Sequence, residues 1–404
     1  MTMKPFTELT DRENAVRLIM QNIEPMSRVE AVPLGEAAGR VLAADVVAGF
    51  DVPPFDRAAM DGYAVKAKDT RGAAKDSPIR LRLIGAQHTG EPYGGEVGDG
   101  EALEIATGSP IPRGSDAVVM VEHTALEGDV VTVYREVKPG RNIAPAGEDM
   151  KEGDHVLSRG AALSPGMVGA LAALGYAEVQ VYEKPRVAIY SSGPEIAPQG
   201  APLRPGQIYD INSYTLAAVI EENGGVPVKR GIALDDAESI EDAVMDAAGH
   251  DMGVFSGGSS VGSKDFLGEV MERLGTVYFH GVSVKPGKPT LFGTVDGTPI
   301  FGMPGYPASC LNNSYVFLAP AIRLAARLPP REAQVLRLSM GHRLESRSDR
   351  EQFITVRVED GKAHRVYKQS GDITSMTHAD GYILLPMGVS VVEEGETVEV
   401  TLLY

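Results

Sequence analysis

Residues 254–266, VFSGGSSVGSKDF, lead from an apolar run through glycines and serines to a carboxylate. Glycine lets a backbone approach a ligand closely, and the free amides at the start of a helix attract anions. The segment therefore favours a phosphate-binding loop, but a tight strand-to-helix turn without a ligand requires glycine equally. It matches neither the Walker A motif nor GxGxxG. The expected ligand contacts are Gly257, Gly258, Ser259, Ser260 and Gly262.

The carboxylate near the end of this segment is Asp265. A carboxylate beside an anion site repels the anion unless a cation lies between them. Mg²⁺ commonly joins one or two carboxylates to phosphate oxygens. We therefore expect Asp265 to be catalytic and to help hold a divalent cation.

Two further glycine-containing loops follow, VKPGKPT at residues 284–290 and GMPGYPAS at residues 302–309. Three such loops closing successive elements of one sheet are expected to form three walls of one pocket. Lys285 and Lys288 then supply local positive charge, although one such lysine is usually a solvated surface charge. The expected ligand contacts in these loops are Pro286, Lys288, Pro304 and Gly305.

The elements that position these loops alternate between strand and helix from Ala177 onward. The predicted strands are residues 186–192, 226–234 and 251–258, and the predicted helices are residues 213–225, 236–249 and 264–275. This order is typical of a mostly parallel sheet with helices on both faces, where ligands bind beyond the C-terminal ends of the strands. Residues 11–24 predict a further helix, and short β segments at 46–133 and from 331 predict two β-rich parts.

The bulk composition indicates a globular chain of several domains. It has 404 residues, 43% of them hydrophobic, a net charge of −17 and a single cysteine, Cys310. One cysteine excludes disulfides within the chain and a cysteine-based zinc site, and a reducing cytoplasm fits best. The negative charge argues against nucleic acid as a partner. No signal peptide or apolar run long enough to span a membrane is expected.

Eight motifs, in order, resemble the molybdopterin molybdenumtransferase family of molybdenum cofactor biosynthesis, which is related to the C-terminal domain of gephyrin. They are PPFDRAAMDGYAV (53–65), ATGSPIPRGSDAVVMVE (106–122), GEDMKEGD (147–154), SSGPEI (191–196), GQIYDINSYTL (206–216), GGSSVGSKD (257–265), PGKP (286–289) and MPGYPAS (303–309). Each motif alone is weak, but the ordered set is specific and covers nearly the whole chain.

The resemblance implies an α/β multidomain fold of four parts. They are a linking domain (1–45 plus 141–176), an inserted β-rich domain (46–140), an α/β molybdopterin-binding domain (177–330) and a C-terminal β-barrel-like domain (331–404). It also implies a homodimer with the active site at the subunit interface. The implied reaction inserts molybdate into adenylylated molybdopterin and releases AMP with the help of Mg²⁺. A molybdopterin adenylyltransferase is a candidate partner.

The resemblance also implies roles for individual residues. It makes Asp61 a catalytic acid contributed across the dimer and gives Thr107 a place beside the oxyanion. The implied catalytic acids are Asp61, Asp149, Glu195, Asp235 and Asp265, and the implied metal ligands are Asp265, Glu195 and Asp235. Asp235 and its neighbour Asp236 also precede a predicted helix, and capping of that helix by either one explains an acid at this position equally well.

Three motifs depart from the family pattern, and the residues that differ are Arg57 and Ala58 in the first, Ser192 and Pro194 in the second and Tyr306 in the third. Tyr306 replaces an asparagine and either stacks on the pterin or fills the pocket wall. A tungstate-preferring enzyme has the same sequence features, so the identity of the oxyanion stays open.

Two other functions are alternatives to the transferase. The first is a molybdopterin adenylyltransferase, which does not need the β-rich parts, so the length of the chain argues against it. The second is a non-catalytic molybdopterin carrier or scaffold. Its ligand is an anion, so it gains little from the many acids of the motifs, and they argue against it.

Overall fold

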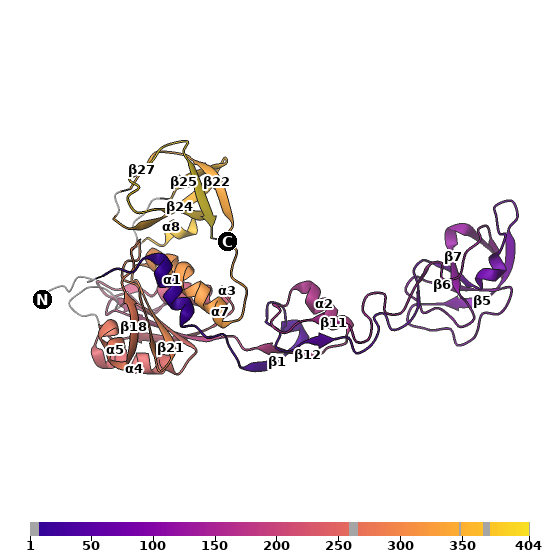
Figure 1. The fold of residues 1–404 in the computed structure, drawn as a ribbon, viewed down its shortest axis with the longest axis horizontal. Helices are drawn as coiled ribbons and strands as arrows, with labels where there is room; N and C mark the ends of the chain where they lie inside the picture. The colour runs from indigo at the N-terminus through magenta and orange to yellow at the C-terminus, as the bar shows by residue number, and fades with distance from the viewer. Residues whose placement is uncertain (1–7, 258–265, 347–348, 367–371, 404) are drawn as a thin grey trace. The chain divides into compact units, whose positions relative to one another are not determined.

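The computed structural model describes residues 8–257, 266–346, 349–366 and 372–403 (Figure 1). The chain divides into two compact units. The first comprises Met1–Glu30, Gly39–Val41 and Val181–Tyr404, and the second comprises Ala31–Ala38 and Leu42–Gln180. In the described part, no helix is both long enough and apolar enough to cross a membrane.

The first unit contains a six-stranded sheet in the order β16-β13-β17-β21-β20-β18. The bounds of its strands are β13 (Arg186–Ser192), β16 (Val226–Ala233), β17 (Met252–Ser256), β18 (Gly275–His280), β20 (Leu291–Val295) and β21 (Thr298–Met303). The first four strands in this order are parallel, and β20 is antiparallel to both of its neighbours. The predicted mostly parallel sheet is therefore confirmed.

Helices cover both faces of this sheet because its central strands are apolar on both sides. In β13, Val187 and Ile189 belong to one buried cluster, and Ala188 and Tyr190 belong to another. The first cluster includes residues of α1, α3 and α7, and the second includes residues of α4 and α5. Figure 1 shows α1 and α7 on one side of the strands and α4 and α5 on the other. The helices of this unit are α1 (Arg12–Gln21), α3 (Asn212–Glu222), α4 (Ala237–Ala248), α5 (Phe266–Leu274), α6 (Pro307–Asn313), the π-helical turn η4 (Ser314–Leu318), α7 (Ala319–Ala325) and α8 (Thr374–Thr377).

A small barrel ends the chain. Strands β24-β25-β22-β28-β26 pair in this order, and β26 pairs back with β24 to close the barrel. Strand β19 (Val284–Lys285) lies parallel to β24 and thereby ties the PGKP loop to the barrel. The barrel strands are β22 (Val335–Met340), β24 (Glu351–Glu359), β25 (Lys362–Arg365), β26 (Gly381–Leu385) and β28 (Thr397–Leu402), with β23 (Leu344–Glu345) and β27 (Val391–Val392) beside them.

The second unit is built around a six-stranded sheet in the order β7-β4-β6-β5-β9-β8. Its strands are β4 (Gly62–Val65), β5 (Ile79–Gln87), β6 (Glu101–Ile105), β7 (Ala117–Met120), β8 (Thr124–Glu127) and β9 (Val130–Val133). The predicted β-rich module is therefore confirmed. Shorter elements are β2 (Val46–Val47) with β11 (His155–Leu157), β3 (Arg57–Ala58) with β10 (Ile143–Ala144), α2 (Pro165–Ala173) and the turns η1 (Leu34–Glu36), η2 (Ala67–Thr70) and η3 (Val121–His123).

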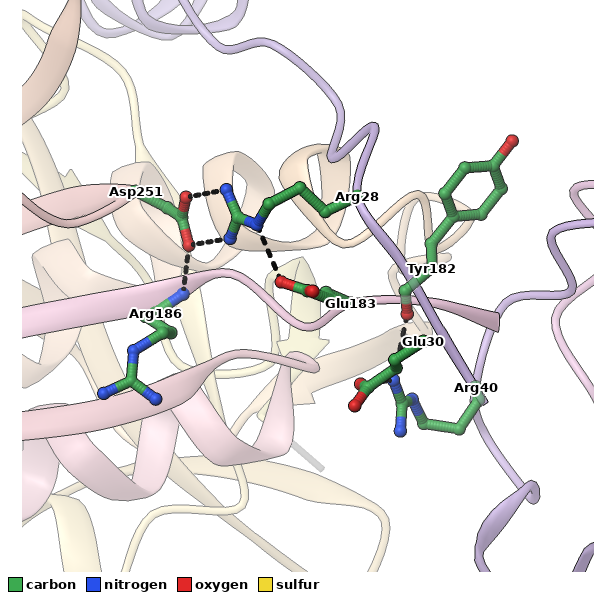
Figure 2. Close-up of polar contacts among 7 residues, drawn as sticks. All are labelled: Arg28, Glu30, Arg40, Tyr182, Glu183, Arg186 and Asp251. Carbon is green, nitrogen blue, oxygen red and sulfur yellow. Dashed lines mark hydrogen bonds and ion pairs between the residues drawn. The ribbon is translucent and has the colours of Figure 1, made fainter. Parts of the chain in front are cut away.

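Arg28 ties three segments of the first unit together (Figure 2). It lies just before β1 (Val29–Pro33), which pairs with β12 (Glu178–Tyr182). Its guanidinium donates to both carboxylate oxygens of Asp251 at 2.9 Å and to Glu183 at 2.7 Å. Asp251 also accepts a hydrogen bond from the backbone N–H of Arg186 at 2.8 Å. The charged partners hold the guanidinium pKa of Arg28 above its usual range, so this pairing keeps its charge at any ordinary pH.

Candidate active site

A cavity of about 1060 Å³ lies at the C-terminal edge of the parallel strands in the first unit. The ends of β13, β17 and β21 reach this edge because the three strands are parallel. Since β20 runs antiparallel to both β18 and β21, the loop from β18 to β20 returns to the same edge. The cavity is therefore lined by Gly257, at the start of the first predicted wall, and by residues 285–289 and 304–309 of the other two.

Buried polar side chains form part of the cavity lining. Ser191 Oγ donates to Asp210 Oδ2 at 2.8 Å, and the backbone N–H of Ser213 donates to Asp210 Oδ1 at 3.1 Å. The Asn212 amide donates to Ser256 Oγ at 2.6 Å and to the Gly305 carbonyl at 2.9 Å. These bonds fix the loop after β21 against the start of α3. Sequence reasoning assigned no role to Asp210 or Asn212, although both lie in the quoted motif GQIYDINSYTL.

Two of the predicted catalytic acids, Glu195 and Asp235, line the cavity. Asp236 caps α4, since its carboxylate accepts hydrogen bonds from Ser239 N at 2.9 Å and Ser239 Oγ at 3.1 Å. Asp235 is therefore not the capping residue. The Glu195 carboxylate lies over Gly193, where an added Cβ would come within 2.7 Å of both carboxylate oxygens. Glycine at position 193 thus allows this placement of Glu195.

The described carboxylates of the cavity fit a cation only together with ligands from elsewhere. Among residues 8–257, 266–346, 349–366 and 372–403, no three His, Cys, Asp or Glu side chains gather in a way that could hold a metal ion. Mg²⁺ is usually held by one or two carboxylates and by phosphate oxygens of a substrate. Glu195 and Asp235 supply carboxylates of this kind at one cavity, so they fit such a shared site.

Basic side chains also line the cavity, and they are Lys285, Lys288, Arg350 and Arg365. They provide local positive charge in a chain whose net charge is −17. The two arginines come from the C-terminal barrel, and the pairing of β19 with β24 brings Arg350 beside the PGKP loop. Sequence reasoning missed both arginines because no local pattern relates residues this far apart.

A buried asparagine holds the PGKP loop in place. Asn313 Nδ2 donates to the Gly287 carbonyl at 2.9 Å and to Thr290 Oγ1 at 2.7 Å. Gly287 has φ +105°, and a Cβ added there would lie 2.2 Å from Asn313 Nδ2. Only glycine therefore lets the loop between Lys285 and Lys288 pack against this amide.

The loop after β17 is described only up to Gly257. Gly257 has φ +89°, and a Cβ added to it would lie 2.5 Å from the Ser192 carbonyl oxygen, so the chain needs glycine here. The other predicted residues of this loop, Gly258, Ser259, Ser260, Gly262 and Asp265, lie outside the described residues. Their assignment as ligand contacts and, for Asp265, as a catalytic metal ligand therefore stays a prediction.

The remaining predicted site residues belong to the second unit and do not line this cavity. Gly62 of β4 pairs with Ile105 of β6, which places Asp61 beside Thr107. Asp61 Oδ1 accepts hydrogen bonds from Thr107 N at 2.6 Å and Thr107 Oγ1 at 2.8 Å. These bonds hold the pKa of Asp61 below its ordinary value of 3.8. Asp149 lies in another loop, where its N–H donates to the Val52 carbonyl at 3.0 Å.

Cys310 is part of the core next to the cavity. Its side chain is fully buried, and burial raises the pKa of the thiol to about 12. The residue is therefore a neutral thiol at physiological pH.

Family models match three parts of the chain. Residues 10–175 match the MoeA N-terminal region (domain I and II), residues 188–324 match a probable molybdopterin binding domain, and residues 337–403 match the MoeA C-terminal region (domain IV). The middle match covers the sheet that carries the cavity. The chain thus combines a probable molybdopterin-binding α/β domain with regions of MoeA type.

Curated relatives and solved structures agree with these matches. The molybdopterin molybdenumtransferase of Haemophilus influenzae is 38% identical over 298 residues, which cover 73% of this chain and 72% of the relative. Molybdopterin molybdenumtransferase 2 of Mycobacterium tuberculosis is 38% identical over 342 residues, 82% of this chain and 83% of the relative. The crystal structure of a molybdopterin biosynthesis MoeA protein from Pyrococcus horikoshii has a TM-score of 0.84 at 38% identity and covers 98% of this chain and 99% of its own.

The chain belongs to the molybdopterin molybdenumtransferase family, whose members are transferases of molybdenum cofactor biosynthesis. The family resemblance and the fold class predicted from the sequence are therefore confirmed.

Proposed function

We propose that this chain inserts molybdate into adenylylated molybdopterin and releases AMP, with Mg²⁺ as the assisting cation. The observation that carries the proposal is that one cavity, at the C-terminal strand edge of a probable molybdopterin binding domain, is lined by both carboxylates and basic side chains. A substrate with a phosphoanhydride requires the basic groups for its phosphates. It requires the acids for a bridging cation and for proton transfer.

The basic and the acidic residues of the cavity have different proposed roles. Lys285, Lys288 and Arg350 bind the phosphate oxygens and the incoming oxyanion. Glu195 and Asp235, together with Asp265, hold the cation, which when bound neutralises charge on the phosphates. The dithiolene sulfurs belong to the pterin, so a buried neutral cysteine needs no part in binding molybdenum.

In the proposed reaction one water molecule attacks the anhydride, so that the P–O–P bond breaks and gives AMP and the pterin monophosphate, and molybdate forms two Mo–S bonds with the dithiolene sulfurs. Two oxo groups of molybdate leave as two waters, which take up the two thiol protons and two further protons. The carboxylates of the cavity take protons from the thiols and return them to the departing oxo groups. Tungstate has the same charge and shape as molybdate, so a tungstate preference is the alternative version of this reaction.

We propose that the enzyme is a homodimer in which Asp61 and Thr107 of one copy complete the cavity of the other. Two features of the second unit support this proposal. Asp61 is exposed and ionised, and exposed apolar side chains lie nearby in the sequence at Val47, Phe50, Phe55 and Met60. A second copy of the chain would cover such side chains.

Other properties follow from the same proposal. The chain would act in the cytoplasm, where its unpaired cysteine is stable, and a molybdopterin adenylyltransferase would supply its substrate. The proposed four-part division keeps the boundaries given above (1–45 plus 141–176, 46–140, 177–330 and 331–404).

Two neighbouring acids provide a matched test of the catalytic role of the cavity. Asp235→Asn removes a carboxylate from the cavity, whereas Asp236→Asn changes an acid that caps α4 and keeps an equally good cap. We expect Asp235→Asn to slow AMP release from adenylylated molybdopterin at least tenfold and Asp236→Asn to leave it within twofold. Equal rates for both variants would contradict the assignment of Asp235. Tight pterin binding by the wild type without AMP release would indicate a carrier.

A further inference from the structure

Tyr306 presents an exposed ring on a rigid turn at the cavity. Its side chain is 66% exposed although the residue lines the cavity. Pro304 and Pro307 restrict the backbone on both sides. The Tyr306 carbonyl accepts a hydrogen bond from Cys310 N at 2.8 Å, and the preceding carbonyl of Gly305 accepts one from Asn212 at 2.9 Å. The base of the ring is therefore fixed, while most of its surface is open to solvent.

The position of Tyr306 gives no structural reason for a tyrosine. It is the N-cap residue of α6, and an N-cap side chain ordinarily accepts a hydrogen bond from the first turn of its helix. Tyr306 makes no such bond. A large ring that neither caps its helix nor packs in the core gains stability only when something covers it.

Two further apolar side chains of the same cavity are exposed. Ile208 and Tyr209 form β15, and their side chains are 51% and 41% exposed. The Tyr209 hydroxyl donates to the Ala201 carbonyl at 3.0 Å, which fixes this second ring. Fixed aromatic rings lose little conformational freedom when a ligand stacks on them, so they are effective binding surfaces.

The cavity therefore combines exposed rings with the basic side chains at Lys285, Lys288, Arg350 and Arg365. A ligand that satisfies both has a flat ring and a phosphate in one molecule. We propose that Tyr306, with Tyr209 and Ile208 in the same cavity lining, forms an aromatic platform that stacks on a flat nitrogen heterocycle of the phosphorylated substrate. This inference rests on the proposed function, whose substrate carries two such rings, adenine and the pterin.

The absence of tryptophan from the chain gives a direct test of contact. Tyr306→Trp places a single tryptophan on the proposed platform. We expect AMP to quench its emission, and ribose 5-phosphate, which has the phosphate but no ring, to leave the emission unchanged. A pterin phosphate in a second titration distinguishes the pterin from adenine as the stacked ring. Quenching by neither ring compound, or by all three compounds equally, would overturn the platform.

Measured affinities test how much Tyr306 contributes to binding, without the introduced tryptophan. Stacking of a base on an aromatic side chain contributes about 1–3 kcal/mol, so Tyr306→Ala should weaken binding of the stacked compound about 5- to 150-fold. Tyr306→Phe should bind it like the wild type, and binding of ribose 5-phosphate should not change. Tyr176, which is 37% exposed and does not line the cavity, provides the control Tyr176→Ala. An unchanged affinity of Tyr306→Ala for both ring compounds would overturn the inference.

The two proposals fail in different ways. If the wild type releases AMP and Tyr306→Ala binds both ring compounds with normal affinity, the platform proposal is wrong and the transferase proposal stands. If the wild type binds a ring compound through Tyr306 but releases no AMP, the platform proposal stands and the proposed reaction is wrong.

Discussion

Gly287→Ala tests whether Asn313 holds the PGKP loop in its binding position. The substitution has two costs in the structure. Backbone strain at φ +105° costs about 1–3 kcal/mol. The added Cβ would lie 2.2 Å from Asn313 Nδ2, so the amide must move and lose its hydrogen bonds to the Gly287 carbonyl and Thr290 Oγ1. Two such bonds contribute about 1–3 kcal/mol together.

Gly297→Ala provides the matched control. Gly297 also has a positive φ, +80°, but a Cβ added there meets no atom within 4 Å. Both variants therefore suffer strain, and only Gly287→Ala also displaces a buried amide. We expect Gly287→Ala to lower the free energy of unfolding by about 1–3 kcal/mol more than Gly297→Ala, measured by urea denaturation.

Anion binding gives a second readout for the same pair. Displacement of the loop moves Lys285 and Lys288, so inorganic phosphate and AMP should bind Gly287→Ala at least tenfold more weakly than Gly297→Ala. Calorimetric titration measures this difference. If the two variants unfold at the same urea concentration and bind AMP equally, Asn313 does not hold the loop and the reasoning is refuted.

Three shorter predictions concern other parts of the chain. Asp251→Asn weakens the charged pairing with Arg28 and should lower the free energy of unfolding by about 1–2 kcal/mol; no loss in urea denaturation would contradict the role given to this pairing. Cys310, with a thiol pKa of about 12, should resist a thiol-reactive disulfide at pH 8 and react completely in urea, and rapid native labelling would contradict its burial. The lowered pKa of Asp61 means that its contribution to stability is present above its ordinary value of 3.8 and is lost as the pH falls through the lowered pKa. Thr107→Val removes the hydroxyl donor and keeps the backbone N–H, so it should raise that pKa part of the way in an NMR titration, and an unchanged pKa would contradict the hydrogen bond from Thr107 Oγ1.

The sheet and its position beneath the site could be predicted because local sequence determines them. Strand β13 contains the apolar run from Val187 to Tyr190, and α3 and α4 follow the predicted strands with helical spacing. The strand ends lie at one edge of the sheet, so the convergence of Gly257 with residues 285–289 and 304–309 on one cavity followed from their order in the sequence.

The details of the site depend on tertiary structure and could not be predicted. Two adjacent acids precede α4, and the sequence does not show that Asp236 is the cap and Asp235 the cavity residue. Arg350 reaches the cavity through the pairing of β19 with β24, which is a long-range contact. The part played by Asn212 depends on its burial against Ser256, a residue of another strand end.

Some of the predicted site residues could be nominated only from the family resemblance, because neither the sequence pattern nor the packing of the chain singles them out. Nothing local distinguishes Asp149 from an ordinary loop acid, and its predicted role still rests on the family alone. The predicted role of Asp265 rests on the electrostatic argument for a carboxylate beside an anion site and on the family, because Asp265 lies outside the described residues.

The central claim is tested most directly by AMP release from adenylylated molybdopterin in a single turnover of the purified enzyme. Parallel reactions contain Mg²⁺ with molybdate, with tungstate, or with no oxyanion. We predict one AMP per active site when an oxyanion is present and little AMP without it, with the faster oxyanion identifying the natural substrate. AMP release at the same rate in all three reactions would indicate a simple hydrolase, and it would contradict the account.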